Sequence, residues 1–241
     1  MIVANVRARF TREDAQLALS LLSQQGRDAE DRGEALLRHG GMEALLDEPA
    51  LLRAIAASPL GAHTSLALFA YVVARHALMQ SGEQDRMLAD YAASVLLHFG
   101  LGGRAMRVAD SDDELYDTLA GILADAEGPD PRRTLLVRAH LGNYALWLAG
   151  LFPDFIEHRR WRRGGPGLDY YDEMGQQGFR LASEHRLANE QGLVPLFKLA
   201  ADRFPVMRVA LNRVSDTLLF PSVSSPERVM RQVRDEVRWR H

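Results

Sequence analysis

The sequence contains no cysteine among its 241 residues, and this absence removes several kinds of chemistry. Without thiols the chain forms no disulfide, no thiolate metal site and no cysteine-held iron–sulfur cluster, and it has no cysteine nucleophile. The absence also favours a cytoplasmic protein. Lysine is nearly missing too, because Lys198 is the only one among 29 lysine and arginine side chains. We attribute this bias to a GC-rich bacterial genome and not to anion recognition.

Long apolar runs are missing as well. The most apolar stretches, residues 65–74 and 145–152, are well short of the ~20 residues that a membrane-spanning helix needs. The first residues, Met1–Arg7, lack the long apolar core and the small-residue cleavage site of a signal peptide. We therefore expect a soluble protein with no membrane partner.

The familiar catalytic motifs are absent from the sequence. There is no Gly-x-Ser-x-Gly nucleophile motif, no Gly-x-Gly-x-x-Gly dinucleotide motif and no Walker loop. The Glu-x-x-His pairs that hold metals in helical bundles are also absent. The sequence accordingly predicts no metal site and no cofactor, and it leaves open whether the chain is an enzyme.

Charge is distributed unevenly along the chain. The formal net charge of −3 argues against general nucleic-acid binding. Residues 1–130 carry 20 acidic and 11 basic side chains, whereas residues 131–241 carry 12 acidic and 18 basic ones. Halves of opposite sign can attract each other within one molecule or between two. The same imbalance also fits a drift of charge over a solvated surface.

The rest of the sequence is dominated by the 3.6-residue periodicity of helices. Thr11 and Ser111, each followed by acidic residues, predict helix starts, and Gly40-Gly41 predicts a helix end. About eleven helical segments with short connectors predict an all-α protein folded as a single compact multi-helix bundle. The apolar residues Ile2, Val3, Val6 and Phe10 suggest a short extended N-terminal arm.

Two long segments, residues 62–80 and 132–152, are apolar enough to be buried helices that share one core. In the first, Leu66, Phe69 and Val73 recur at helical spacing, and we expect them to face inward. A Ser- and Pro-rich linker follows residue 221. We therefore expect one helical domain over residues 1–221 and a linker plus a C-terminal helix over residues 222–241.

Four side chains with polar groups lie on one face of the predicted helix 132–152: His140, Asn143, Tyr144 and Trp147. Their spacing of i, i+3, i+4 and i+7 makes them project from one side. They suit a ligand pocket in which the imidazole acts as a base and the hydroxyl and amide act as donors. His185 ends a core stripe on a later helix and is a candidate to face this pocket. The alternative is a buried polar cluster or a wet groove against a neighbouring helix.

A basic segment is the sharpest local feature of the sequence. Four arginines surround a tryptophan: Arg159, Arg160, Trp161, Arg162 and Arg163. Such a cluster suits an anion or nucleotide site. Two alternatives remain open, namely local neutralisation by Asp169, Asp172 and Glu173, or a protein interface.

The last predicted helix is basic and amphipathic. Its apolar side chains are Val229, Met230, Val233 and Val237, and arginines occupy much of the remaining surface. We expect the helix either to pack on the body of the protein or to dock on an acidic surface of a second copy. Asp235 and Glu236 interrupt the basic face and argue against a membrane surface.

Three functions from different classes fit these observations. The preferred one is a helical binding or scaffold protein without catalysis, forming a homodimer through the C-terminal helix. The second is a small-molecule-binding protein or enzyme with its pocket on the helix 132–152. The third is a metal or haem oxidoreductase built in a helical bundle.

Overall fold

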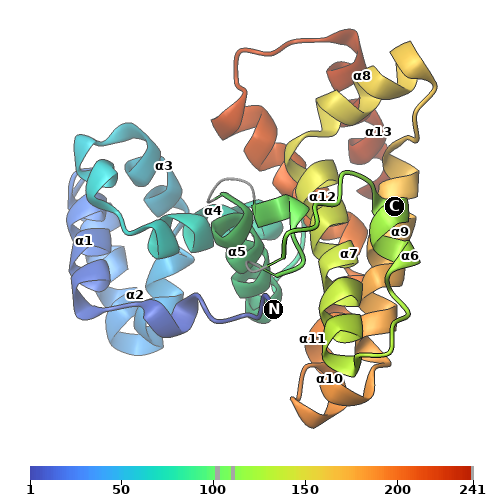
Figure 1. Ribbon diagram of the computed structural model, residues 1–241. Coiled ribbons are helices and arrows are strands. Elements are labelled where there is room, and N and C mark those ends of the chain that lie inside the picture. The colour runs from blue at the N-terminus through green and yellow to red at the C-terminus, as the bar shows by residue number, and fades with distance from the viewer. Residues whose placement is uncertain (101–103, 110–111, 240–241) are drawn as a thin grey trace. The chain divides into compact units, whose positions relative to one another are not determined.

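The computed structural model describes residues 1–100, 104–109 and 112–239 (Figure 1). These residues form thirteen α-helices and no β-strand, and eleven of the helices have at least seven residues. The predicted all-α fold with about eleven helices is confirmed.

The chain separates into two compact units. Unit 1 contains Met1–Ile2, Ser81–Glu83 and the chain from His98 onward, and unit 2 contains Val3–Gln80 and Gln84–Leu97. The predicted boundary at residue 221 stays a prediction.

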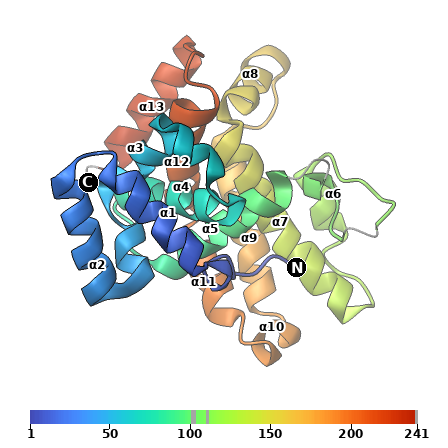
Figure 2. The same cartoon turned by 90° about the vertical axis from the view of Figure 1, so that its left-hand side faces the viewer.

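Unit 2 holds the first five helices and two 3-10 turns. Their bounds are η1 (Arg7–Arg9), α1 (Arg12–Ser23), α2 (Arg27–Leu46), α3 (Pro49–Ala57), η2 (Pro59–His63), α4 (Leu66–Gln80) and most of α5 (Arg86–Gly100). Figure 2 shows α1 and α2 side by side. The first ten residues contain no strand, and Val6 is buried with its N–H donated to Asp90 Oδ1 at 2.7 Å.

The helix boundaries of unit 2 follow local sequence closely. Thr11 accepts the N–H of Asp14, whose carboxylate accepts the N–H of Thr11 at 2.9 Å, so the expected capping box is present. Gly41 interrupts α2 with a φ of +71°, where the sequence predicted the helix to end. The chain resumes a helical course afterwards and reaches Leu46.

The predicted inward-facing side of α4 is wrong at two of its three residues. Leu66 is 66% exposed and Phe69 is also exposed, whereas Val73 is buried as predicted. From Ala70 to Leu78 every side chain of α4 is buried. A helix that is covered on all sides has no single apolar stripe, so helical spacing does not reveal which residues of its first turns face solvent.

Unit 1 contains the remaining helices. They are η3 (Arg104–Met106), α6 (Leu119–Ala124), α7 (Pro131–Leu151), α8 (Pro153–Arg163), α9 (Leu168–Ser183), α10 (Arg186–Glu190), α11 (Val194–Asp202), α12 (Phe204–Val214), a π-helical turn η4 (Ser215–Leu219) and α13 (Pro226–Trp239).

Helix α7 is the centre of unit 1. It runs along α9 and also packs against α12 and α6 (Figure 1). The contact with α9 is backbone to backbone, because a Cβ atom on Gly178 would lie 2.6 Å from the amide nitrogen of Gly142. Only glycine at position 178 allows the two helices to approach this closely.

The prediction of a helix that starts at Ser111 is wrong for the residues after Ser111 that the structure describes. Ser111 lies outside the described residues, and residues 112–117 are not helical. Helix α6 begins only at Leu119, where the side chain of Thr118 accepts the N–H of Gly121. The carboxylate of Asp112 accepts the N–H of Ala109 and pairs with Arg133, so a tertiary contact replaces the predicted cap.

Candidate functional site

Helix α13 packs its charged side against the rest of unit 1 and exposes its apolar side to solvent. Arg228 and Arg231 are buried, with Arg231 only 1% exposed, whereas Met230 is 69% exposed. Val229 and Val233 are exposed as well. The helix packs on α8, but through the face opposite to its apolar stripe. The side chain of Val237, the fourth apolar residue expected there, lies outside the described part.

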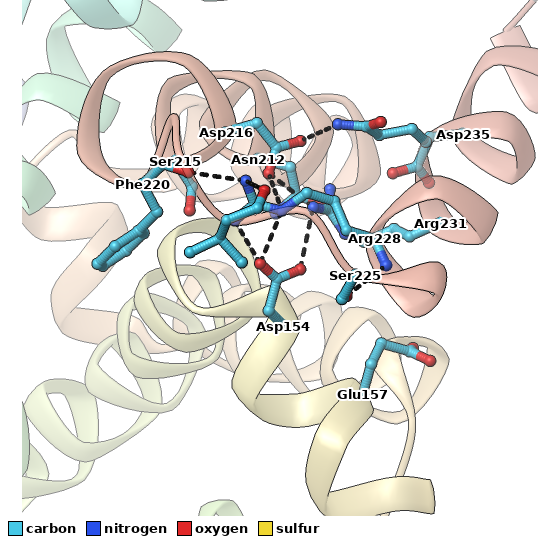
Figure 3. A network of polar contacts seen from close by, with 12 residues as sticks. Asp154, Glu157, Asn212, Ser215, Asp216, Phe220, Ser225, Arg228, Arg231 and Asp235 are labelled. Carbon is cyan, nitrogen blue, oxygen red and sulfur yellow. Dashed lines mark hydrogen bonds and ion pairs between the residues drawn. The ribbon is translucent and has the colours of Figure 1, made fainter.

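Two aspartates receive the buried arginines of α13 (Figure 3). Arg228 Nε donates to Asp154 Oδ2 at 2.8 Å, and its Nη1 donates to the carbonyl oxygens of Phe220 and Val223. Arg231 Nη2 donates to Asp216 Oδ1 at 2.7 Å and to Asp154 Oδ1 at 3.3 Å. Asp154 lies in the first turn of α8 and Asp216 in the π-helical turn, so two separate elements hold α13.

A second buried cluster lies at Arg208 of α12, which is 2% exposed. Its Nε donates to Asp172 Oδ1 at 2.8 Å, and its Nη2 donates to Asp235 Oδ1 of α13 at 3.3 Å. Burial lowers the pKa of Arg208, but the two carboxylates outweigh this effect and raise it. The cluster ties α13 to α9 and α12 as well as to α8.

These contacts explain why α13 is oriented with its charges inward. A buried arginine or aspartate without its partner carries a large desolvation penalty, so each charge must meet its counterion. Rotating α13 to bury its apolar side would expose Arg228 and Arg231 and leave Asp154 and Asp216 without them. The rotation would also take Asp235 away from Arg208. The apolar stripe therefore stays outside.

A cavity of about 290 Å³ lies beside this network. Its walls include Asp216, Arg231 and Asp235. These charges already attach α13 to the rest of the unit, and the volume lies at the low end for small-molecule sites. The cavity therefore belongs to the anchoring of α13.

Two of the four candidate residues predicted on α7 line a cavity, and the other two do not. His140 and Asn143 line a smaller cavity of about 120 Å³ together with His98 and Phe99. Tyr144 stacks on His140 with the ring centroids 5.9 Å apart, and Trp147 packs edge-on against Phe99. Tyr144 and Trp147 thus pack against residues that line the cavity. A role of the four candidate residues in ligand binding stays a prediction.

His185 does not join this cavity. It is the N-cap of the short helix α10, where its Nδ1 accepts the backbone N–H of Leu187 at 3.2 Å. Burial and the charges of Arg138 and Arg186 lower the pKa of His185. Its environment is that of a helix cap.

The arginine segment occupies the end of α8. Arg160 Nη1 lies 3.9 Å from Glu157 Oε2. Arg162 and Arg163 form no ion pair within the described residues. Asp172, one of the carboxylates considered for local neutralisation, pairs with Arg208. Trp161 is exposed. An anion site or an interface at this segment stays a prediction.

The described residues contain neither a metal-ligand cluster nor a membrane-spanning helix. No group of three or more histidine, aspartate and glutamate side chains is placed to hold a metal ion within residues 1–100, 104–109 and 112–239. Over the same ranges, no helix combines the length and apolar character needed to cross a bilayer.

Sequence reasoning missed the ion-pair network that holds α13. A pattern for part of it was present, since Arg228, Arg231 and Asp235 recur at spacings of three and four and share one helical face. The usual assumption that the apolar face of an amphipathic helix is buried pointed the other way. The acceptors Asp154 and Asp216 stand far away in sequence, with no pattern linking them to α13.

Comparison with known proteins adds no assignment to these observations. No protein-family model, curated protein or solved structure matches this chain.

Proposed function

We propose that this protein is a helical interaction protein, without catalysis of its own, that forms a twofold homodimer through α13. The observation that carries the proposal is the outward apolar stripe of Val229, Met230 and Val233 on a helix fixed by buried ion pairs. The partner is a second copy and not nucleic acid or a membrane. A bacterial cytoplasmic location, which the absence of cysteine favours, belongs to the same proposal.

The charges beside the stripe support a second copy as the occupant. Glu227 and Arg234 are seven residues apart, so they lie on the same flank of α13 within about 20°. When two identical helices pair antiparallel about a twofold axis, each flank meets the same flank of the other helix. An axis that passes between positions 230 and 231 sets Glu227 opposite Arg234 of the partner subunit, and the reverse pair forms by symmetry.

The segment before α13 also carries exposed apolar side chains. Leu219, Phe220 and Val223 of that segment are exposed. A stable interface buries roughly 800 Å² on each partner, which is more than one short stripe provides. The segment that precedes α13 in the sequence belongs to the same unit and supplies further apolar surface.

The first test is the molar mass of the purified protein by light scattering. We expect a dimer for the wild type and a dissociation constant raised at least about tenfold by Met230→Glu, because a charge would enter the apolar contact. Leu66→Glu is the matched control. Leu66 is 66% exposed against 69% for Met230 but lies in unit 2, so its substitution leaves the dimer intact.

A charge-reversal pair tests the geometry of the dimer. Glu227→Arg alone and Arg234→Glu alone each place like charges opposite one another and weaken association. The two substitutions together restore opposite charges across the interface and recover part of the lost association. Recovery is partial because Arg234 Nη2 also lies 3.6 Å from Glu157 Oε1, so Arg234→Glu replaces that ion pair with two like charges. A wild type that stays monomeric at the highest attainable concentration would refute the dimer. Failure of the double variant to recover would refute the antiparallel pairing.

A further inference from the structure

Helix α8 presents a basic and aromatic surface that the proposed dimer does not use. Phe155, Arg159 and Arg162 recur at spacings of four and three, so they share one face of the helix. All three side chains are exposed, Phe155 to 55%. Trp161, which precedes the last of them in the sequence, is 70% exposed. We call these four side chains the α8 face.

Both carboxylates of α8 contact α13 and not the α8 face. Asp154 pairs with the buried arginines of α13, and Glu157 Oε1 lies 3.6 Å from Arg234 Nη2. Glu157 is two positions away from Phe155 and from Arg159, and residues two apart on a helix do not face each other. The charges of the α8 face are therefore positive, and no carboxylate of the same helix offsets them.

The arginines of this helix lie next to its exposed aromatic rings. The guanidinium carbon of Arg159 lies 5.8 Å from the centroid of the Phe155 ring. The guanidinium carbon of Arg160 lies 5.9 Å from the ring centroid of Trp161. Within the described part of the chain, neither Arg159 nor Arg162 forms an ion pair. Positive charge and apolar surface thus occur side by side at two places.

Such a surface suits a partner that brings carboxylates and an apolar side chain together. The planar guanidinium group binds a carboxylate through two parallel hydrogen bonds. Arginine and tryptophan are also enriched among the residues that contribute most to protein–protein binding. Because exposed ion pairs alone contribute little free energy, the apolar contact supplies affinity and the charges select the partner.

A membrane and a nucleic acid do not match this geometry. Phe155 and Trp161 are six positions apart, which places them about 120° apart around the helix, so they do not form the single apolar side that enters a bilayer. A long nucleic acid extends beyond the α8 face and meets the net charge of −3 of the whole chain. A short acidic segment meets mainly the charges within the Debye length, which is ~8 Å at physiological salt.

We infer that the α8 face binds a short acidic segment of another protein, in which carboxylate side chains flank an apolar one. The helix rises about 10 Å from Phe155 to Arg162, which equals the length of about three extended residues. The inference goes beyond the proposed dimer and is independent of it, because the α8 face shares no residue with the exposed stripe of α13.

The probe is a labelled peptide of three glutamates, two leucines and three glutamates. When it is extended, each side of this peptide carries a leucine between glutamates. We expect it to bind the 241-residue chain at least about tenfold more tightly than two control peptides, in which glutamine replaces glutamate or serine replaces leucine. Fluorescence anisotropy measures the binding. In about 1 M salt, where the Debye length is ~3 Å, the advantage over the glutamine peptide should disappear and the advantage over the serine peptide should remain.

Two sets of variants locate the binding. Arg159→Gln combined with Arg162→Gln should lower the affinity for the acidic peptide about tenfold. The matched control combines Arg53→Gln with Arg132→Gln, which removes the same charge from exposed positions elsewhere and should change the affinity less than about twofold. Phe155→Ser keeps every charge, so the preference for the leucine peptide over the serine peptide should fall at least about threefold.

Several outcomes would overturn the inference. Absence of binding, equal binding of the three peptides, or an equal loss of affinity in the control pair would each contradict it. Tighter binding of anionic phospholipid vesicles, or of an oligothymidylate of the same length, would identify a membrane or a nucleic acid as the partner instead. A lower molar mass of Phe155→Ser in light scattering would show that a second copy covers the α8 face.

Discussion

Both compact units contain buried arginine, but the packing around it differs between them. In unit 2, Arg75 is 3% exposed on a helix whose other side chains around it are buried and largely apolar. Its Nε and Nη2 donate to Asp47 at 2.7 and 3.1 Å. In unit 1, Arg228 and Arg231 are buried on a helix whose apolar side chains are exposed. The ion pair accompanies apolar packing in α4 and replaces it in α13.

This difference shows what an amphipathic pattern can and cannot determine. Burial of apolar surface holds α4, so its orientation tolerates a weakened ion pair. The orientation of α13 depends on matched charges, because its charged side is buried and its apolar stripe is exposed. A helix held in this way leaves its apolar side exposed to solvent.

The two buried histidines extend the comparison. In unit 2, Nε2 of His76 lies 2.9 Å from the carbonyl oxygen of Leu46, so this ring meets a protein partner. In unit 1, Nε2 of His140 has none among the described residues. Unit 2 therefore provides its buried histidine with a partner for Nε2, whereas the described residues of unit 1 provide none.

We expect the largest effect from removing an aspartate that pairs with the buried arginines of α13. Asp216→Ala leaves Arg231 and Arg228 with one aspartate between them, and we expect a loss of about 3 kcal/mol in the free energy of unfolding. Hydrogen exchange should show α13 opening locally before the rest of unit 1 unfolds.

The matched variant in unit 2 is Asp47→Ala. Burial raises the pKa of Asp47, but its hydrogen bonds with Arg75 and Arg86 outweigh burial and lower it, so this carboxylate is also an engaged anion. We expect α4 to keep its protection from exchange up to global unfolding in this variant. Equal local opening of α4 and α13 would contradict the distinction between the two helices.

A second prediction concerns pH and the two histidines. Burial lowers the folded pKa of His140 to about 4, from the ordinary value of 6.5, so the unfolded chain binds this proton first as the pH falls. The associated stability is present above pH 6.5 and is lost as the pH falls toward 4. Between pH 7 and 5 the wild type should lose about 2 kcal/mol more than His140→Phe, measured by urea denaturation.

His76→Phe should behave differently from His140→Phe. It removes the ring nitrogen that contacts the carbonyl of Leu46, so it should lower stability already at pH 7. Parallel pH profiles for the wild type and His140→Phe would show that His140 is not the buried neutral group described above.

The smallest expected effect compares two buried glycines. In Gly178→Ala the new Cβ meets the backbone of Gly142 at 2.6 Å, and backbone cannot move aside easily. In Gly33→Ala of α2 the nearest atom, also at 2.6 Å, is the Cδ1 end of Leu22, which can rotate. We expect Gly178→Ala to cost about 1 kcal/mol more than Gly33→Ala in thermal unfolding. A larger loss for Gly33→Ala would show that the α7–α9 contact is the more adaptable one.

Local sequence predicted most of the helices because their ends depend on neighbouring residues. The Thr11 cap and the break at Gly41 follow from hydrogen bonds and dihedral angles within a few residues. The start expected at Ser111 failed for the opposite reason. There Asp112 pairs with Arg133, which is 21 positions away and invisible to any local pattern.

The candidate site was predicted only in part. Spacing on α7 placed His140 and Asn143 on one face, and the structure places both in one cavity wall. Their neighbours Phe99 and Ile2 come from distant segments, so neither the size of the cavity nor its lining could be derived from helical spacing. His185 was expected near them because it ends a core stripe, but it caps α10 instead.

The sequence alone determined that this chain is helical and where most helices begin and end, because those features depend on contacts within one or two turns. Tertiary structure alone decided which face of α13 is buried. The acceptors Asp154 and Asp216 lie on other elements, and a buried charge is stable only beside its counterion.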